Sequence, residues 1–410
     1  MTYENNLPYL ELNPEIEETI RKDREHHWVN PYACRDEDIV RREEKPHDAA
    51  SLVRPAFSRD IDKILNVAAY NRYAGKTQVF SFVENDEICR RGLHVQLVSR
   101  IARSLGELLG LNVDLIEAIA LGHDVGHTPL GHAGERFLST CYHKRTGRYF
   151  NHNVHSVRVL DKLYRRNISL QTLNGVICHN GEFAQQVVKT RPMESFGDLD
   201  SCYEDCCVDE QVIKTLRPST LEGCVVRVSD MIAYIGKDRQ DALEMGILDD
   251  LSAFHSEILG TDNARIINNL IVDIVNNSYR CQEIRMSKEI FEDLRLAKRE
   301  NYEIIYDREG LRDNDKTTIA DIFEEVYDRL LTDLAEENEN SPIYRHHIAN
   351  LCRQSRSITK ESYLDQDPNQ IVVDYIASMT DNYFMDLYDY LFPQSNKTIF
   401  TQRYFSDLSD

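Results

Sequence analysis

The stretch Leu121-Gly-His-Asp-Val-Gly-His-Thr-Pro-Leu-Gly-His-Ala-Gly-Glu135 contains three histidines, two carboxylates and four glycines. His123 and Asp124 are adjacent, so an imidazole nitrogen and a carboxylate oxygen can both face one divalent cation if a helix ends there. Glycines allow close backbone approach, and Pro129 prevents a continuous helix through the stretch. We therefore expect a helix, a metal-binding corner, a loop, and a new helix that begins near His132.

Two further segments can complete a metal site. His94 begins a segment whose apolar residues recur at helical spacing. Asp230 lies in an otherwise apolar helical run, where an unpaired buried carboxylate would be costly. The candidate metal ligands are therefore His94, His123, Asp124 and Asp230. This mixture of nitrogen and oxygen donors suits Mn, Fe(II), Co or Zn.

The order His…His-Asp…Asp resembles the signature of the HD-domain metal phosphohydrolases. The longer pattern His-Asp-x-Gly-His-x-Pro-x-Gly-His-x-Gly-Glu, complete from His123 to Glu135, is narrower and resembles the deoxynucleotide triphosphohydrolases of the dGTPase type. The likeness covers roughly residues 50 to 392, and its other blocks are residues 58–65 with Arg72 and 76–80, then 150–156, 230–238 and 374–381. The resemblance implies the same four metal ligands.

The phosphate contacts are expected from two places. Arg91 lies one helical turn before His94, so its guanidinium can share that face and bind a phosphate oxygen. Arg90 is the competing choice and is expected to be exposed. By resemblance, His152 contacts the α-phosphate. His155 has two equally good interpretations: it belongs to the site, or it is an ordinary polar residue on the face of a helix.

An acid–base pair is expected at His132 and Glu135. Their i, i+3 spacing lets the carboxylate orient one ring nitrogen and leave the other for the substrate. Such a pair alone is more often a surface salt bridge, but in the family that this chain resembles the corresponding histidine contacts or protonates the leaving group. His127 is expected to shape the loop or to lie near the phosphates.

Three residues are candidates for binding the sugar. Tyr234 and Asp238 follow Asp230 by four and eight residues, so all three share one helix face. The tyrosine ring would pack on a deoxyribose and exclude a 2′-OH, while Asp238 and Gln78 would hydrogen-bond the 3′-OH. Without the resemblance, a core tyrosine and a surface acid would be the preferred interpretation. Met231 stands where some relatives, the animal SAM-and-HD-domain enzymes, have a phosphate-binding lysine, so one triphosphate contact must come from elsewhere.

Composition limits the remaining classes. The chain has 410 residues, 41% hydrophobic and 29% charged, as in a soluble globular protein. It has no apolar run long enough to span a membrane, and because the N-terminal residues lack a basic region and an apolar core we expect no signal peptide there. Its ten cysteines show no spacing typical of a disulfide framework. We therefore expect reduced thiols and a cytoplasmic protein. For the cluster at Cys202, Cys206 and Cys207, buried free thiols are preferred to a zinc site.

The net charge of -21 argues against nucleic acid as a main partner. A nucleotide is also an anion, so positive charge must be local. A local excess is expected beside the site blocks, at Arg72, Lys76, Arg90, Arg91 and Arg136.

The hydrophobic pattern predicts an all-α fold, an HD-domain helical core with helical additions at both ends. We expect an irregular arm over residues 1–50 with a short helix near 15–25, a catalytic core over 51–250, a C-terminal helical region over 251–392 and an irregular tail over 393–410. Helices are predicted over residues 94–109, 112–123, 153–165, 169–179, 209–216, 223–242, 253–259, 263–279, 287–307, 318–336, 341–353 and 371–391. Short strands are candidates at 79–83 and 186–189.

The resemblance implies hydrolysis of 2′-deoxynucleoside 5′-triphosphates, dGTP or dNTPs, to deoxynucleoside and inorganic triphosphate. It implies one divalent metal ion, with Mg²⁺ an additional candidate on the substrate phosphates, and a homo-oligomer. Two alternatives remain open: another phosphohydrolase activity, such as a 5′-nucleotidase or a cyclic-nucleotide phosphodiesterase, and a non-catalytic regulator that senses nucleotides or binds single strands.

Overall fold

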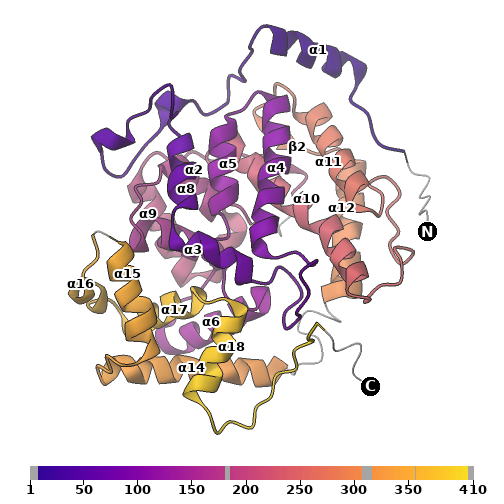
Figure 1. Cartoon of the computed structure of the whole chain (residues 1–410). Helices are drawn as coiled ribbons and strands as arrows, with labels where there is room; N and C mark the ends of the chain where they lie inside the picture. Colours follow the sequence, from indigo (N-terminus) through magenta and orange to yellow (C-terminus); the bar gives the residue numbers. More distant parts are fainter. Residues whose placement is uncertain (1–7, 181–184, 307–315, 356, 405–410) are drawn as a thin grey trace.

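The computed structural model describes residues 8–180, 185–306, 316–355 and 357–404, and within these the chain is almost entirely helical (Figure 1). The predicted all-α class is confirmed. The described α-helices are α1 (Pro14–Glu25), α2 (Ser58–Leu65), α3 (Ala68–Asn71), α4 (Arg91–Leu109), α5 (Val113–Gly122), α6 (Gly131–Thr146), α7 (His152–Val157), α8 (Leu170–Ile177), α9 (Phe196–Val208), α10 (Leu221–Glu244), α11 (Asn263–Ser278), α12 (Lys288–Asn301), α14 (Lys316–Ala335), α15 (Ala349–Gln354), α16 (Lys360–Leu364), α17 (Pro368–Ala377) and α18 (Asp381–Leu391).

Short 3-10 and π-helical elements join or extend these helices. They are η1 (Asp36–Asp38), η2 (Pro46–Asp48), η3 (Arg72–Gly75), η4 (Arg158–Leu163), η5 (Glu210–Thr215), η6 (Tyr302–Tyr306) and η7 (Ile343–Ile348). Among the described residues, the one sheet pairs β1 (Val187–Lys189) antiparallel with β2 (Glu283–Arg285), with Val188 opposite Ile284. The strand candidate at 186–189 is thus confirmed. The candidate at 79–83 contributes only an isolated bridge, between Val83 and Gln402.

The helices that carry the site pack around α10. This helix contacts α4, α5, α8 and α11. The apolar faces of α4, α5, α10 and α11 form one buried cluster. A second buried cluster joins α6, α7, α8 and α9 to α14, α17 and α18 from the C-terminal part of the chain. In Figure 1, α14 lies on the lower side of the molecule, where it contacts α6, α17 and α18. The expected division of the chain at residue 250 stays a prediction.

Local sequence explains where the two central helices meet. α4 ends at Gly110, whose φ of 69° is left-handed, and glycine adopts this conformation without strain. Asn112 then caps α5, because its side chain accepts hydrogen bonds from the backbone nitrogens of Asp114 and Leu115. The two helices therefore return side by side, with the start of α4 and the end of α5 near each other.

The N-terminal arm is attached to the helical body. Its helix α1 has the predicted extent and buries Ile20. The Trp28 ring packs so closely on Gly110 that a Cβ at residue 110 would lie 2.7 Å from it. Asp23 forms an ion pair of 2.6 Å with Arg280, directly after α11. These contacts hold the arm against the segments that follow α4 and α11, and α1 lies at the top of the view in Figure 1.

Three details of the predicted helices are wrong. Residues 253–259 are irregular, because the Asp293 carboxylate of α12 accepts the hydroxyl of Ser256 and the backbone nitrogens of residues 257–259, which replaces helical hydrogen bonds. The helix predicted over 371–391 is two helices, since Thr380 caps α18 after α17 has ended. Helix α9 was not predicted; it buries only Leu199, Cys206 and Cys207, so its apolar pattern is weak. Residues 307 and 405–410 of the predicted elements lie outside the described residues.

Candidate metal centre and active site

The motif loop takes the expected course between α5 and α6. Helix α5 ends at Gly122, so His123 and Asp124 lie at its C-terminal end. A Cβ on Gly126 would lie 2.2 Å from the backbone nitrogen of Ser156, which explains why glycine occupies this position. Leu130 and Gly131 both have positive φ, 60° and 54°, and they turn the chain into α6. The new helix near His132 is confirmed.

Side chains from three separate segments meet as the candidate metal ligands. The ligand atoms of His94, His123 and Asp230 lie within 4.8 Å of one another, and Asp230 Oδ1 is 3.0 Å from His94 Nε2. Asp124 lies beside this group, with its Oδ1 3.7 Å from His123 Nε2. His123 Nδ1 is 2.7 Å from the carbonyl of Ala120, so its Nε2 carries the lone pair that a metal requires.

The charges of these residues fit a divalent cation. Burial disfavours ionisation of Asp124, but Arg91 and His123 outweigh it and hold its pKa well below the usual range. For Asp230, burial is likewise outweighed, by His94 and His123, and the pKa is about 2. Within the described structure, the buried Nε2 of His123 has no hydrogen-bond partner. The buried Asp124, the partly buried Asp230 and an orphaned imidazole nitrogen form a cluster that could hold a metal ion.

Arg91 faces this cluster from the first turn of α4. Its Nη1 forms a buried ion pair with Asp124. Its Nε and Nη2 are buried and have no hydrogen-bond partner among the described residues, so two donors remain for an anion. Arg90 was expected to be exposed, and this is wrong: it is half-buried and donates to Thr77 Oγ1 and to the carbonyl of Val83.

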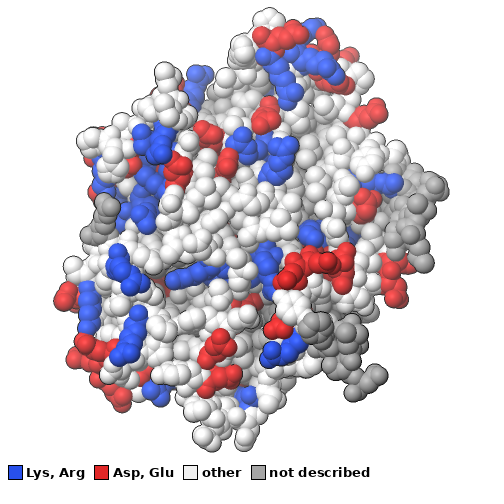
Figure 2. Space-filling model, in the orientation of Figure 1, with Lys and Arg blue, Asp and Glu red and all other residues white. Residues whose placement is uncertain are grey.

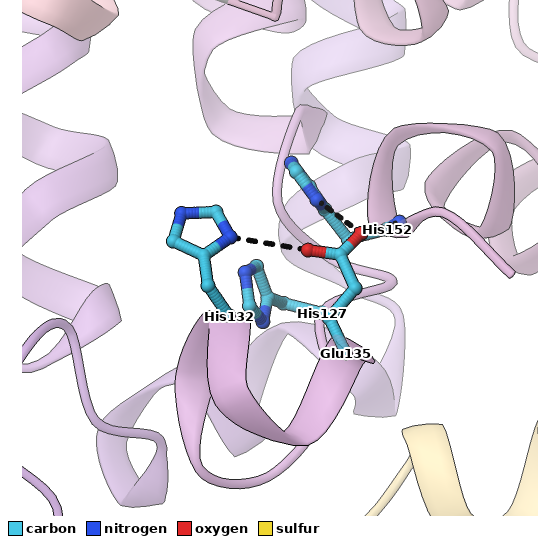
Figure 3. Close-up of side chains that lie close together, drawn as sticks. All are labelled: His127, His132, Glu135 and His152. Carbon is cyan, nitrogen blue, oxygen red and sulfur yellow. Dashed lines mark hydrogen bonds and ion pairs between the residues drawn. The ribbon is translucent and has the colours of Figure 1, made fainter. Parts of the chain in front are cut away.

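Glu135 lies between His132 and His152, as Figure 3 shows. Its Oε2 is 3.1 Å from His132 Nδ1, and its Oε1 is 2.8 Å from His152 Nδ1. Burial would raise the pKa of Glu135, but the two histidines outweigh it and hold this pKa well below the usual range. The side chain of His132 is 54% exposed, against 6% for His152. His132 is therefore the member that an incoming molecule meets first.

The other two histidines of the sequence blocks occupy different places. The His127 ring lies 4.6 Å from that of His152, and burial beside Arg91 holds its pKa well below the usual range, so it is neutral. His155 is outside the cluster: its Nδ1 is 3.9 Å from Asp374, and burial lowers its pKa to about 4. It lines a small cavity that it shares with Arg72 and His347.

The sugar candidates carry buried acceptors without partners. Within the described residues, neither Gln78 Oε1 nor Asp238 Oδ1 has a hydrogen-bond partner. Burial raises the pKa of Asp238 to about 7, although Tyr306 donates its hydroxyl to the other carboxylate oxygen at 2.5 Å. Tyr234 is half-buried on the same helix, with the Lys298 ammonium 5.9 Å from its ring centre. These acceptors can receive a ligand hydroxyl.

Sequence reasoning missed two residues here. His179, just after α8, is buried with its Nε2 3.1 Å from that of His152. Tyr306 ends η6 and contacts Asp238 from a segment 68 residues away. His179 is a lone histidine at the end of an apolar helix, and Tyr306 an aromatic residue in a helical run. Neither has a local pattern that distinguishes it from a core residue.

The C-terminal helices hold the motif loop in place. The buried ammonium of Lys76 donates to the carbonyls of His127 and Ala377, so this lysine is not available to a substrate.

The surface charge is mixed. On the face drawn in Figure 2, basic and acidic side chains are interspersed. The described part of the chain contains no helix with the length and apolarity needed to cross a membrane. Cys206 and Cys207 are buried free thiols, as predicted, whereas the free thiol of Cys202 is only half-buried.

Two protein-family models match parts of this chain. Residues 91–235 match the HD domain, and residues 284–390 match the phosphohydrolase-associated domain. The chain is therefore an HD-domain phosphohydrolase.

Similar proteins include the deoxyguanosinetriphosphate triphosphohydrolase-like proteins of Caldanaerobacter subterraneus subsp. tengcongensis (31% identical, covering 91% of this chain and 95% of that protein) and Desulfatibacillum aliphaticivorans (30% identical, covering 90% and 96%). The chain belongs to this family of deoxyguanosinetriphosphate triphosphohydrolase-like proteins.

Proposed function

We propose that the protein hydrolyses 2′-deoxynucleoside 5′-triphosphates to deoxynucleoside and inorganic triphosphate. The proposal is supported by three features of the described residues. They are a buried histidine–carboxylate cluster, two unpartnered donors on Arg91, and the unpartnered acceptors of Asp238 and Gln78. The family membership supports the same reaction class.

His94, His123, Asp124 and Asp230 would hold the divalent cation, with Mn, Fe, Co and Zn as candidates and Mg²⁺ a further candidate on the phosphates. When bound, such a cation lowers the pKa of water toward neutrality and stabilises charge on the α-phosphate. Arg91 is kept in position by its ion pair with Asp124, and its remaining donors bind phosphate oxygens.

The bond that breaks joins the α-phosphorus to the 5′-oxygen, and a water oxygen forms the new bond to phosphorus. The departing 5′-oxygen needs a proton. The imidazolium form of His132 supplies it from Nε2 and becomes neutral, because its Nδ1 faces Glu135 and its side chain is accessible. His152 lies deeper, with its Nε2 3.7 Å from Asp124 Oδ1, and it would contact the α-phosphate.

The sugar is bound by residues of α10 and of the segment after η3. The 3′-OH donates a hydrogen bond to a side-chain oxygen of Asp238 or Gln78. The Tyr234 ring packs on the deoxyribose and excludes a 2′-OH. In this arrangement a 2′-OH is excluded sterically by the ring, and the 3′-OH of the substrate is recognised by hydrogen bonds.

The test is an incubation of the protein with each dNTP, each rNTP, dNMPs and cyclic nucleotides, with Mn²⁺ or Mg²⁺ in turn. We expect inorganic triphosphate and deoxynucleoside from dNTPs. His143→Gln on α6, a surface position, is the matched control and should behave as wild type. Turnover of only dNMPs or cyclic nucleotides would establish one of the other phosphohydrolase activities, and binding without turnover would establish a regulator.

We also propose a homo-oligomer. Leu52 and Val53 are the most exposed large apolar side chains in the described structure, at a turn between Ser51 and Arg54. Light scattering during size-exclusion chromatography should give more than one chain per particle. A monomer across the concentration range of the activity assay would disprove this proposal.

A further inference from the structure

A small cavity borders the motif loop, and the residues that line it include none of the proposed metal ligands. Its walls come from α3 and η3, from α7 and η4, from η7 and α15, and from α17 (Figure 1). Val125, which directly follows Asp124, forms part of the wall. The centre of a water molecule can occupy about 20 Å³ of this space. A site for one water molecule needs roughly 10–15 Å³, so the cavity has room for a particle of about that size and not for a nucleotide or a phosphate group.

Two side chains line the cavity with donors that have no acceptor. Within the described residues, the guanidinium of Arg72 forms no hydrogen bond and no ion pair. A guanidinium has five N–H donors and no acceptor. The ring of His155 is buried, and its Nδ1 lies 3.9 Å from Asp374 Oδ1, which is too far for a hydrogen bond. Both side chains therefore have donors left for a ligand.

Lys76 adds a buried ammonium to the same cavity. It donates to the carbonyls of His127 and Ala377, which carry no net charge, and it has no ion pair in the part of the chain that the structure describes. An ammonium has three N–H groups, so one is left. Burial and the nearby Arg72 lower the pKa of Lys76 well below its usual range. This is the behaviour of a buried cation that lacks a negative partner.

The carboxylate that lines the cavity does not supply the missing charge. Asp374 accepts hydrogen bonds from Arg158 at 2.6 and 2.7 Å, and others from the Tyr363 hydroxyl and the Gln370 amide. Its charge is therefore matched by Arg158, and the positive charge of Arg72 remains. A cation is disfavoured in such a cavity, and a water molecule brings no negative charge. A small anion accepts from the open donors and also balances their charge.

We propose that this cavity binds one small monovalent anion, of the halide class, between Arg72, Lys76 and His155. The ion would accept hydrogen bonds from the guanidinium, from the ammonium and from the imidazole N–H. Because Lys76 holds the carbonyl of His127, and Val125 lines the cavity, the ion would stabilise the motif loop from outside the metal centre. The proposal does not rest on the proposed reaction, in which none of these three side chains takes part.

Bromide is the probe for the direct test, because it resembles chloride and scatters X-rays anomalously. Crystals of the full-length protein are grown without halide, soaked in sodium bromide and measured at the bromine absorption edge. We expect an anomalous peak beside Arg72 in the wild type and none in Arg72→Gln. Arg100, an exposed arginine of α4, is the matched control, and Arg100→Gln should keep the peak. A wild-type cavity that holds only water would overturn the site.

Thermal unfolding in solution gives a second readout. Melting temperatures are measured over a range of bromide concentrations, with sodium gluconate keeping the ionic strength constant, since gluconate is too large for the cavity. A tenfold excess over the dissociation constant should raise the melting temperature of the wild type by about 1–2 °C, and the rise should saturate. Arg72→Gln should lose this saturable rise, Arg72→Lys should retain part of it, and Arg100→Gln should behave as wild type.

Two results of the melting experiment would overturn the proposal. One is the absence of a saturable rise in the wild type, and the other is an equal rise in a folded Arg72→Gln. Both measurements on the wild type remain decisive if Arg72→Gln does not fold. Neither depends on metal content or on triphosphate release, so the anion site and the proposed function can fail separately.

Discussion

The carboxylate of Asp381, at the start of α18, accepts a hydrogen bond from the backbone nitrogen of Leu130, 3.0 Å away. Its other oxygen accepts from the backbone nitrogen of Thr77 at 3.1 Å. One side chain of the C-terminal region therefore fixes both the motif loop, directly before His132, and the segment that carries Gln78. The phosphohydrolase-associated domain is in this way part of the site's framework.

Asp381→Asn tests this connection. Its amide group offers only one acceptor oxygen, so either Leu130 or Thr77 loses its partner, at a cost of roughly 1–3 kcal/mol in stability. We expect kcat with dNTPs to fall while the metal content stays at the wild-type level. Asp386→Asn, at an exposed position of the same helix, is the control. Equal kinetics and equal melting temperatures for the two variants would show that the connection has no role.

His132→Ala tests the proposed general acid without removing a proposed metal ligand. Because its ring contacts Glu135 and lies outside the proposed ligand groups around Asp124, metal binding should be unchanged. Loss of a general acid lowers the rate by about 100- to 10,000-fold. Steady-state kinetics and elemental analysis on the same preparation measure both quantities. Turnover near that of wild type would mean that His132 is structural and that another group protonates the leaving oxygen.

The sequence alone predicted the parts of this structure that depend on local pattern. The string from His123 to Glu135 requires a helix end, a glycine-rich loop and a helix start, and the structure has all three. His94 and Asp230 were identifiable because a polar residue interrupts an apolar helical face. Long amphipathic helices were predicted for the same reason.

Contacts between distant segments were not accessible in this way. His179, Tyr306 and Asp381 gain their roles from partners 27, 68 and 251 residues away. The irregular course of residues 253–259 depends on the Asp293 carboxylate from another helix, which outcompetes local helix formation. These contacts, and the irregular course of residues 253–259, depend on tertiary structure. A single sequence shows no periodic pattern that would predict them.

Asp238 should make both stability and substrate use depend on pH. Its pKa is raised to about 7 in the folded protein, so its contribution to stability is fully present below the ordinary value near 4 and is lost as the pH rises toward 7. The loss is at most about 4 kcal/mol, three pKa units. Asp238→Asn cannot ionise, so it should melt at a higher temperature than wild type at pH 8 and at a similar one at pH 4.

The catalytic efficiency should change with pH in the opposite direction to the stability. The ionised carboxylate is the stronger acceptor for the 3′-OH, so kcat/KM of the wild type for dNTPs should rise through pH 7. This rise should be absent in Asp238→Asn and weak for 3′-deoxy substrates. A wild-type profile that is flat between pH 6 and 8, with equal melting curves for both proteins, would remove Asp238 from the sugar site.

Tyr234 gives the most specific prediction, because its position follows from that of a proposed metal ligand. It stands one helical turn after Asp230 on α10, and Asp238 stands one turn further, so a nucleotide whose α-phosphate meets the metal cluster would place its sugar beside the ring. The ring should exclude a 2′-OH by shape, and the unmodified protein should therefore prefer dGTP to GTP in kcat/KM. Tyr234→Ala should raise the relative kcat/KM for GTP and leave metal content unchanged, whereas Tyr234→Phe should retain the preference because the ring remains. Equal kcat/KM for GTP and dGTP in the unmodified protein would contradict this arrangement and favour a general phosphohydrolase.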